Sequence, residues 1–181
     1  MHYTGTIWRP PYEAYSLLVQ VTAGCTHHSC KFCTLYEDLP FKFKLSPFSE
    51  VKADLAEASK YYRKIPRIFF TGANPFVLST EKLKTLAKMV KEYYPFYKTI
   101  GCFARITDIM PKSLEELKEL RALGYDGITI GVETGDDESL TFMNKGFQSK
   151  DVLEQCRKLD EAGISYNFFY LTGIYGAGRG E

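Results

Sequence analysis

Three of the five cysteines stand close together in the chain, at Cys25, Cys30 and Cys33, separated by four and then two residues. A short loop can point all three thiolates inward, so this spacing suits one small inorganic centre. Zinc is one option, because His27 or His28 could supply the fourth ligand of a structural site. A 4Fe-4S cluster is the other, and with only three cysteine ligands it would leave one iron open to bind and activate a second molecule.

The two other cysteines fall elsewhere. Cys102 lies in an expected strand and Cys156 on the apolar face of an expected helix, so we predict that both are small core residues. An odd number of cysteines, with three crowded together, favours metal or redox chemistry over disulfides in a reducing compartment. Residues 1–9 lack the basic and apolar parts of a signal peptide, and no apolar stretch approaches the ~20 residues that span a bilayer. We therefore expect a cytoplasmic protein with no membrane association.

Two positions that follow expected strands could bind a charged ligand. Gly72, with Ala73 and Asn74 after it, would let backbone carbonyls approach an ammonium group, although a plain turn would also explain the glycine. Arg105 could pair with a carboxylate of a cofactor or substrate. The alternative for Arg105 is a surface ion pair with Asp108.

Two later positions complete the set of candidate ligand contacts. The carboxylate of Glu133 could accept two hydrogen bonds from a ribose diol. Its alternative is an acid favoured at a helix N-terminus, which better explains Asp136 and Asp137. Gly173 would permit a flat ring to approach the backbone closely, and Ile174 could pack on that ring.

The elements that must position these residues form a regular series. Short apolar runs alternate with stretches of helical periodicity, as in sheets of buried parallel strands. The expected strands are residues 16–21, 67–71, 99–104, 127–132 and 165–171. Ser46 and Pro47 predict a helix that begins with proline at its first position, and Ser113 with Glu116 matches a capping box. The pattern predicts repeated βα units, in which chemistry gathers where the strands end.

Radical S-adenosylmethionine (SAM) enzymes have a cluster loop that resembles residues 24–33, GCTHHSCKFC. The usual gaps are three and then two residues, with an aromatic residue before the last cysteine, and Phe32 keeps that aromatic. A subgroup carries the longer first gap found here, often with Arg-Pro-Pro upstream, and Arg9-Pro10-Pro11 matches it. The resemblance extends over nearly the whole chain, at the ends of successive strands.

The resemblance implies an α/β fold, a partial parallel (β/α) barrel of the TIM-like radical SAM type, over residues 16–181 after an N-terminal extension of residues 1–15. Cys25, Cys30 and Cys33 would hold a 4Fe-4S cluster. The contacts implied for SAM are Phe32, Gly72, Ala73, Asn74, Arg105, Glu133, Gly173 and Ile174. Five strands are found where the family's partial barrel has six, so we expect the core to be truncated before the sixth βα unit.

The resemblance also implies an enzyme. The reduced cluster would cleave SAM to methionine and a 5′-deoxyadenosyl radical, which abstracts hydrogen from a substrate left unidentified. The implied partners are SAM and a reductant such as a flavodoxin or ferredoxin. Two alternatives stay open: a zinc-stabilised α/β binding module without catalysis, and a barrel enzyme of other chemistry whose metal loop is structural.

Composition narrows the classes further. Hydrophobic residues make up 45% of the chain and charged residues 25%, which is typical of a globular domain and argues against disorder. The net charge of +1 gives no sign of a polyanion partner bound by bulk electrostatics, and we find no clear nucleic-acid signature. The 15% of aromatic residues suits a core or a pocket.

Overall fold

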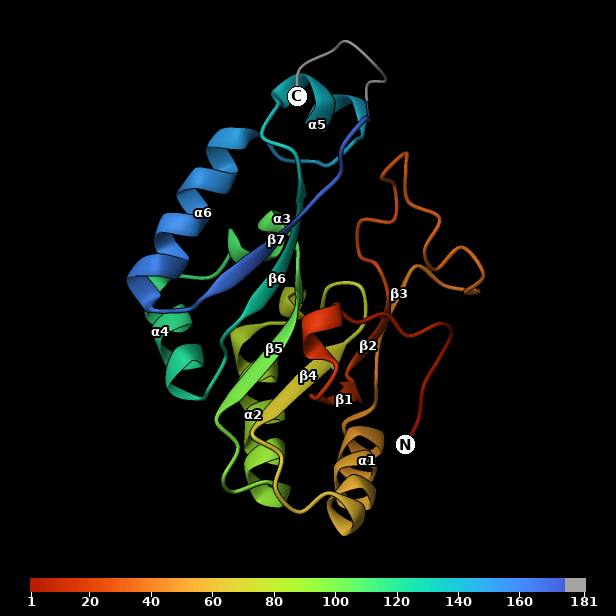
Figure 1. The fold of residues 1–181 in the computed structure, drawn as a ribbon, viewed down its shortest axis with the longest axis vertical. Coiled ribbons are helices and arrows are strands. Elements are labelled where there is room, and N and C mark those ends of the chain that lie inside the picture. Colours follow the sequence, from red (N-terminus) through yellow and green to blue (C-terminus); the bar gives the residue numbers. More distant parts are fainter. Residues whose placement is uncertain (175–181) are drawn as a thin grey trace.

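Five parallel strands form the main sheet of the computed structural model, which describes residues 1–174. Residues 175–181, which include most of the glycine-rich segment that follows Gly173, lie outside the described residues. The strands neighbour one another in the order β1 (Leu17–Gln20), β4 (Arg67–Thr71), β5 (Thr99–Ala104), β6 (Ile128–Glu133) and β7 (Tyr166–Tyr170). Each strand is added beside the previous one, so β1 and β7 are the outer strands (Figure 1). The predicted series of βα units in an open parallel barrel is confirmed.

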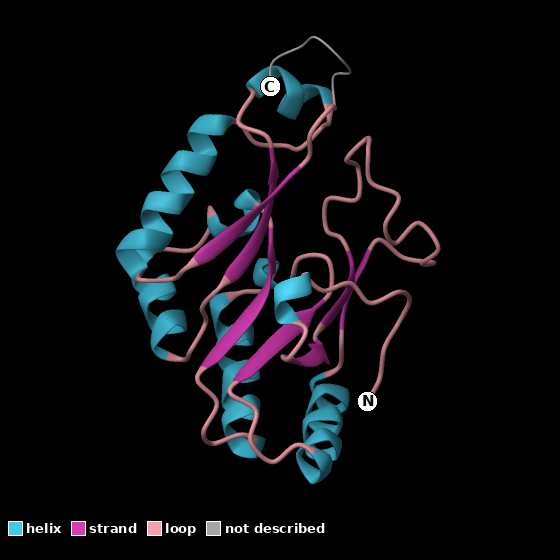
Figure 2. Cartoon of the chain, viewed as in Figure 1, coloured by secondary structure: helices cyan, strands magenta, loops and turns pink. Residues whose placement is uncertain are grey.

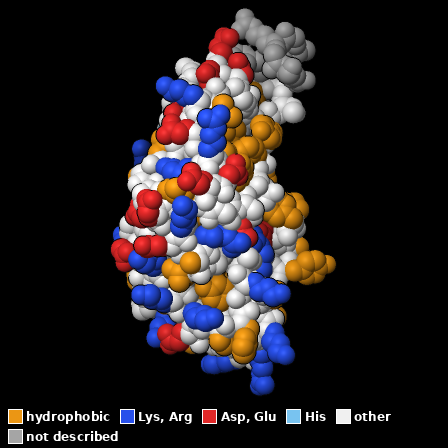
Figure 3. Space-filling model, turned by 90° about the vertical axis from the view of Figure 1, so that its left-hand side faces the viewer, with side chains coloured by type: hydrophobic (Ala, Val, Ile, Leu, Met, Phe, Trp, Pro, Cys, Tyr) orange, Lys and Arg blue, Asp and Glu red, His pale blue; other side chains and the backbone are white. Residues whose placement is uncertain are grey.

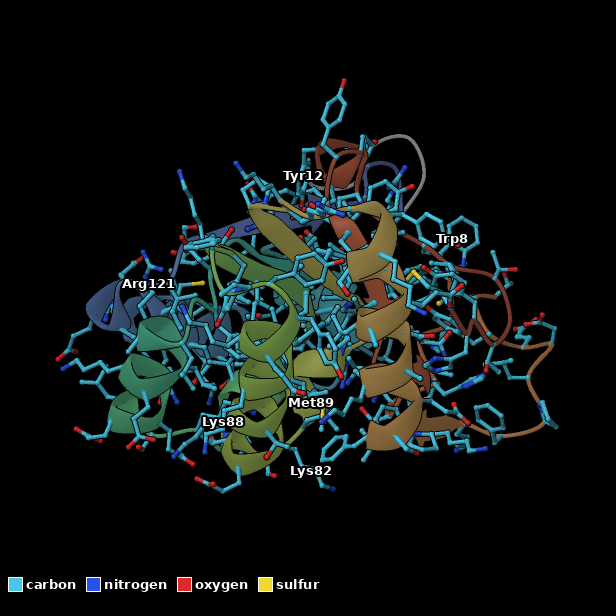
Figure 4. All side chains as sticks on the ribbon, turned by 90° about the horizontal axis from the view of Figure 1, so that it is seen from below. Trp8, Tyr12, Lys82, Lys88, Met89 and Arg121 are labelled. Carbon is cyan, nitrogen blue, oxygen red and sulfur yellow. The ribbon has the colours of Figure 1, made fainter. Side chains whose placement is uncertain are left out.

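Helices connect the strands and cover one face of the sheet (Figure 2). The long ones are α1 (Phe48–Tyr61), α2 (Thr80–Tyr93), α4 (Leu114–Ala122) and α6 (Ser149–Ala162). The short ones are α3 (Ile106–Ile109), α5 (Asp137–Phe142) and the 3-10 turns η1 (Pro11–Glu13) and η2 (Pro75–Val77). Seen from below, α1, α2 and α4 lie on one side of the sheet and Tyr12 lies on the other (Figure 4).

Two local features differ from the sequence-based expectation. A small antiparallel pair, β2 (Thr22–Gly24) with β3 (Phe43–Leu45), flanks the cysteine loop and was not predicted. The predicted start of the helix at Pro47 is wrong by one residue: Pro47 is the N-cap, and α1 begins at Phe48. The Ser46 hydroxyl lies 3.2 Å from Nε2 of His2 instead of capping the helix. The capping box of Ser113 and Glu116 is confirmed by reciprocal hydrogen bonds of 2.8 and 3.1 Å.

Both faces of the central strands are apolar, which explains their continuous hydrophobic runs. In β4, Ile68 and Phe70 belong to the buried core under the helices, where Cys102 and Cys156 also lie, as predicted. Phe69 points to the opposite, inner face and packs edge-to-face on Phe103, with ring centroids 5.2 Å apart. Phe103 in turn contacts Phe169 of β7, at 6.1 Å. The three rings form an aromatic layer across the inside of the open barrel.

The outer surface carries mixed charges. Lys and Arg side chains are interspersed with Asp and Glu on the face that includes α4 and α6 (Figure 3). This interspersion agrees with the small net charge of the chain. None of the helices described in residues 1–174 is long and apolar enough to cross a membrane.

The N-terminal segment crosses the inner face of the sheet and is anchored at the end opposite the cysteines. Glu13 is 1% exposed and accepts hydrogen bonds of 2.9 and 3.0 Å from Nε of Arg67. The same guanidinium donates to the Thr99 hydroxyl, at 3.0 Å, and to the carbonyls of Asp126 and Gly127. Arg67 thereby ties the segment to the starts of β4, β5 and β6.

We expect Glu13→Ala to destabilise the fold, because it leaves the partly buried Arg67 guanidinium without its carboxylate. Loss of one partner of a buried pair costs about 3 kcal/mol, and the partial exposure of Arg67 lowers this to about 2 kcal/mol. Urea denaturation measures the change in the free energy of unfolding. The matched control is Glu161→Ala on the exposed side of α6; equal stabilities of the two variants would contradict the anchoring role.

Candidate active site

The cysteine loop projects from the β2–β3 pair, which closes its base. The amide of Cys25 donates to the carbonyl of Lys42, at 2.8 Å, across the two ends of the loop. Gly24 makes this closure possible: its φ is +73°, and a Cβ there would lie 2.1 Å from the Lys42 carbonyl oxygen. Only glycine permits so close an approach, so the sequence before the first cysteine fixes where the loop starts.

Cys25, Cys30 and Cys33 line one cavity of about 300 Å³ at the carboxyl ends of the strands. All three are free, half-buried thiols. Burial raises the pKa of Cys30 and Cys33, and the nearby Lys145 ammonium opposes this rise. A raised pKa leaves fewer of these cysteines as thiolates. A bound metal centre would favour the thiolate again, because cysteine binds metals in its deprotonated form.

Zinc and a 4Fe-4S cluster place different demands on this loop, because only zinc would use a histidine of the loop as a ligand. Within the described part of the chain, no three His, Cys, Asp or Glu side chains form a group that could hold a metal ion as they stand. His27 has its Nε2 within 2.6 Å of the Asn144 carbonyl oxygen, so that nitrogen already has a partner. The three thiols line one cavity, which both a zinc site and a cluster require.

Four of the predicted SAM contacts line the same cavity: Phe32, Ala73, Arg105 and Glu133. They come from the cysteine loop and from the segments that follow β4, β5 and the end of β6. The βα topology therefore brings together residues separated by up to a hundred positions, as predicted from their places after the strands.

Asn74 is placed differently from the other predicted contacts. It is fully buried, and its amide donates to the Thr26 hydroxyl, at 2.7 Å, and to both carboxylate oxygens of Asp108, at 3.1 Å. Its carbonyl oxygen accepts from the Thr26 amide, at 3.3 Å. The side chain of Asn74 thus joins the cysteine loop to the segment after β5, and it is absent from the cavity wall.

Three further predicted contacts also lie off the wall. Gly72 has φ +130°, and a Cβ on it would come within 2.0 Å of the Thr22 hydroxyl, so this glycine lets the end of β4 lie against β2. Gly173 has φ +73°, and none of the described residues lies within 4 Å of a Cβ built on it. Ile174 packs against the hydrophobic core. Their roles toward a ligand stay predictions.

Glu133 occupies a strained position at the end of β6. Its φ is +72°, unusual for a residue with a side chain, and the strand register shifts between Gly131 and Glu133. The carboxylate is buried and accepts from Nζ of Lys145, at 3.0 Å. Gly131 leaves room for it, because a Cβ there would lie 2.8 Å from Oε1 of Glu133. The bulge therefore turns a charged group into the cavity.

Arg105 lines the cavity, as expected. The alternative expectation was an ion pair with Asp108, but the guanidinium has other partners. The guanidinium donates to the Thr107 hydroxyl, at 2.8 Å, and to the main-chain carbonyl of Lys145. The contact with Asp108 is made by the main chain: the Arg105 amide donates to Oδ2, at 2.8 Å. Asp136 is the N-cap of α5, which agrees with its interpretation as an acid at a helix N-terminus.

Sequence reasoning missed several residues on the wall. Lys145 is 3% exposed, and its ammonium also lies 5.6 Å from the ring of Phe32 and 5.5 Å from that of Phe147. Trp8 and Arg9, from the N-terminal segment, complete another side. The only sequence signals were the Arg-Pro-Pro motif and the position of Lys145 downstream of Glu133.

The fold and the cavity define an α/β barrel enzyme whose site lies at the carboxyl ends of parallel strands. The family model of the Radical SAM superfamily matches residues 19–181, so this chain belongs to that superfamily.

Individual proteins of known name are similar to parts of this chain. The heme chaperone HemW of Bacillus subtilis is 30% identical over 97 residues, which are 54% of this chain and 26% of HemW. An uncharacterized methyltransferase of Synechocystis is 26% identical over 178 residues, 93% of this chain and 31% of that protein. Among solved structures, the radical SAM methyltransferase TsrM of Kitasatospora setae, with cobalamin and a [4Fe-4S] cluster bound, has a TM-score of 0.67 at 17% identity, over 87% of this chain and 31% of TsrM. The chain spans about a third or less of these relatives' lengths.

We expect Asp108 to make the fold more stable in mild acid. Burial raises its pKa to about 6, although hydrogen bonds from Arg105 and Asn74 act in the opposite direction. A carboxyl with a raised pKa favours the folded state below its unfolded pKa, and that contribution is lost as the pH rises through 6. Between about pH 5 and pH 7 the loss is about 1 kcal/mol.

Asp108→Asn should flatten this pH dependence, measured as the free energy of unfolding in urea at several pH values. Glu115→Gln, an exposed change on α4, is the control and should keep the wild-type slope. A wild-type slope in Asp108→Asn would show that other groups cause the pH dependence.

Proposed function

We propose that this chain binds a 4Fe-4S cluster through Cys25, Cys30 and Cys33 and binds SAM in the adjoining cavity. The observation that carries the proposal is the shared wall: three free thiols line the same cavity as the buried Glu133–Lys145 pair. Family membership supports both cofactors. When bound, the reduced cluster supplies an electron that cleaves SAM to methionine and a 5′-deoxyadenosyl radical, which takes hydrogen from the substrate.

Each group of the wall has a task that its chemistry suits. The carboxylate of Glu133 can accept hydrogen bonds from the ribose hydroxyls. The cations Lys145 and Arg105 can hold the carboxylate of the methionine moiety. The main-chain carbonyl of Ala73 can accept from its amino group. These assignments place a zwitterion among opposite charges that the protein has already oriented.

The apolar part of the wall protects this chemistry. Phe32, Phe103 and Phe169 border the cavity and offer no exchangeable polar hydrogen. Apolar walls displace water from around the reacting groups and strengthen electrostatic contacts there. Electrons would come from a small carrier such as a flavodoxin or ferredoxin, which forms part of the proposal.

Substitution of each loop cysteine tests the cluster. After anaerobic reconstitution, the wild type should contain about four iron and four sulfide per chain, and Cys25→Ala, Cys30→Ala and Cys33→Ala should lose most of both. Cys156→Ala, a change in the core, is the matched control and should keep the cluster.

Two outcomes would contradict this reading. One is stoichiometric, tightly bound zinc with no cluster obtainable. The other is loss of bound metal when His27 and His28 are both replaced by Ala, because those residues serve as ligands only in a zinc site. Dithionite-dependent release of 5′-deoxyadenosine from SAM measures the activity itself.

A second prediction concerns Glu133 and Lys145. Either single change leaves a buried charge unpaired, so the double variant Glu133→Gln, Lys145→Met is preferred because it keeps the pair neutral. We expect it to keep its iron but to bind SAM about tenfold or more weakly in equilibrium dialysis, since charge-assisted hydrogen bonds to the ligand are lost. Unchanged SAM affinity with full iron content would remove both residues from the cofactor site.

A further inference from the structure

The N-terminal segment forms one wall of the cavity and is held firmly at both ends. At its start, the His2 amide donates to Asp54, at 2.8 Å, and the Thr4 amide donates to Gln20, at 2.7 Å. At its other end, Glu13 binds Arg67, and the Tyr12 hydroxyl lies 2.8 Å from that of Thr129. Trp8 and Arg9 lie between these anchors and line the cavity.

Arg9 lies in a segment whose backbone has little conformational freedom. Pro10 and Pro11 follow it directly, and each proline ring restricts its own φ. Pro10 is extended, with φ −64° and ψ 147°, and is buried. Little conformational entropy of the main chain is therefore left to lose when Arg9 engages a ligand.

Of the three cationic side chains that line the cavity, Arg9 has no hydrogen-bond or ion-pair partner among the described residues. Throughout residues 1–174 it makes no hydrogen bond or ion pair, whereas Lys145 is paired with Glu133 and Arg105 donates to Thr107 and to a carbonyl. Five donors in a planar fork match a carboxylate or phosphate group. The cavity thus has one complete anion-binding group beyond those assigned to SAM.

Apart from its charged groups and thiols, the cavity that Arg9 lines is largely apolar and aromatic. Trp8 precedes Arg9 in the chain, and Phe103, Phe169 and Leu35 line the same cavity. A guanidinium beside such surfaces selects a molecule that combines an anionic oxygen group with an apolar body, because either part alone leaves the other half of the site unsatisfied.

We propose that Trp8 and Arg9 recognise the substrate, and that this substrate carries a carboxylate or phosphate group attached to an apolar portion. The proposal rests on the proposed function, in which Lys145, Arg105 and Glu133 serve SAM. Trp8 contacts the apolar portion and Arg9 the anionic oxygens.

Trp8 provides the readout, since it is the one tryptophan in the chain. The probes are benzoate and phenyl phosphate, with benzyl alcohol as the uncharged counterpart, titrated against Trp8 emission in the reconstituted protein and in protein without cluster. We expect at least one anion to bind about tenfold or more tightly than benzyl alcohol. Arg9→Gln should reduce this preference to about twofold or less, and the control Arg63→Gln, an exposed arginine after α1, should keep it.

Three results overturn the proposal: no preference for either anion in the wild type, a preference that survives Arg9→Gln, or an Arg9→Gln variant that loses SAM as strongly as the anions in equilibrium dialysis. The last result would assign Arg9 to the cofactor. Anion binding that depends on Arg9 in a chain that takes up neither cluster nor SAM would support this inference and contradict only the proposed function. Whichever of benzoate and phenyl phosphate binds more tightly shows whether the site prefers a carboxylate or a phosphate group.

Discussion

The buried carboxylate of Asp108 connects the segments on which the site is built. It accepts from the main chain after β5 and from the amide of Asn74 after β4, and Asn74 reaches Thr26 in the cysteine loop. Three loops that are distant in sequence therefore share one set of hydrogen bonds in an interior where each unmade bond is costly. A shift of any loop would break bonds in the other two, so the positions of Cys25 and Arg105 are coupled.

The backbone conformation of Glu133 and its ion pair with Lys145 fix another part of the cavity. Along β6, a bulge and a left-handed backbone at Glu133 turn its carboxylate toward Lys145. Such strain persists only where surrounding contacts compensate for it, and here the Leu171 amide donates to the Glu133 carbonyl, at 2.9 Å. Opposite charges are thus oriented before any ligand arrives, which lowers the reorganisation that binding requires.

The sequence was sufficient for features that depend on local patterns. Runs such as 67–71 and 99–104 are apolar because both faces of their strands are buried, and the series of strands and helices then determines a parallel sheet. The β2–β3 pair escaped prediction because each strand has three residues and the partner lies about twenty positions away, beyond any periodic signal. The prediction that Asn74 contacts SAM shows a different limit of sequence analysis. An amide after a strand can bind a ligand or the protein equally well, and only the tertiary position of Asp108 and Thr26 decides between them.

The same limit applies to Trp8 and Arg9, whose place on the wall depends on contacts between distant parts of the chain. The Tyr12 hydroxyl and Thr129 are separated by 117 positions, and Glu13 and Arg67 by 54. During synthesis residues 1–13 emerge before the sheet, and their partner on β6 does not exist until most of the sheet has been made. Contacts of such long sequence separation form late in folding. Residues 1–13 are therefore among the last to settle, and the cavity acquires this wall only after the strands that carry the other walls are in place.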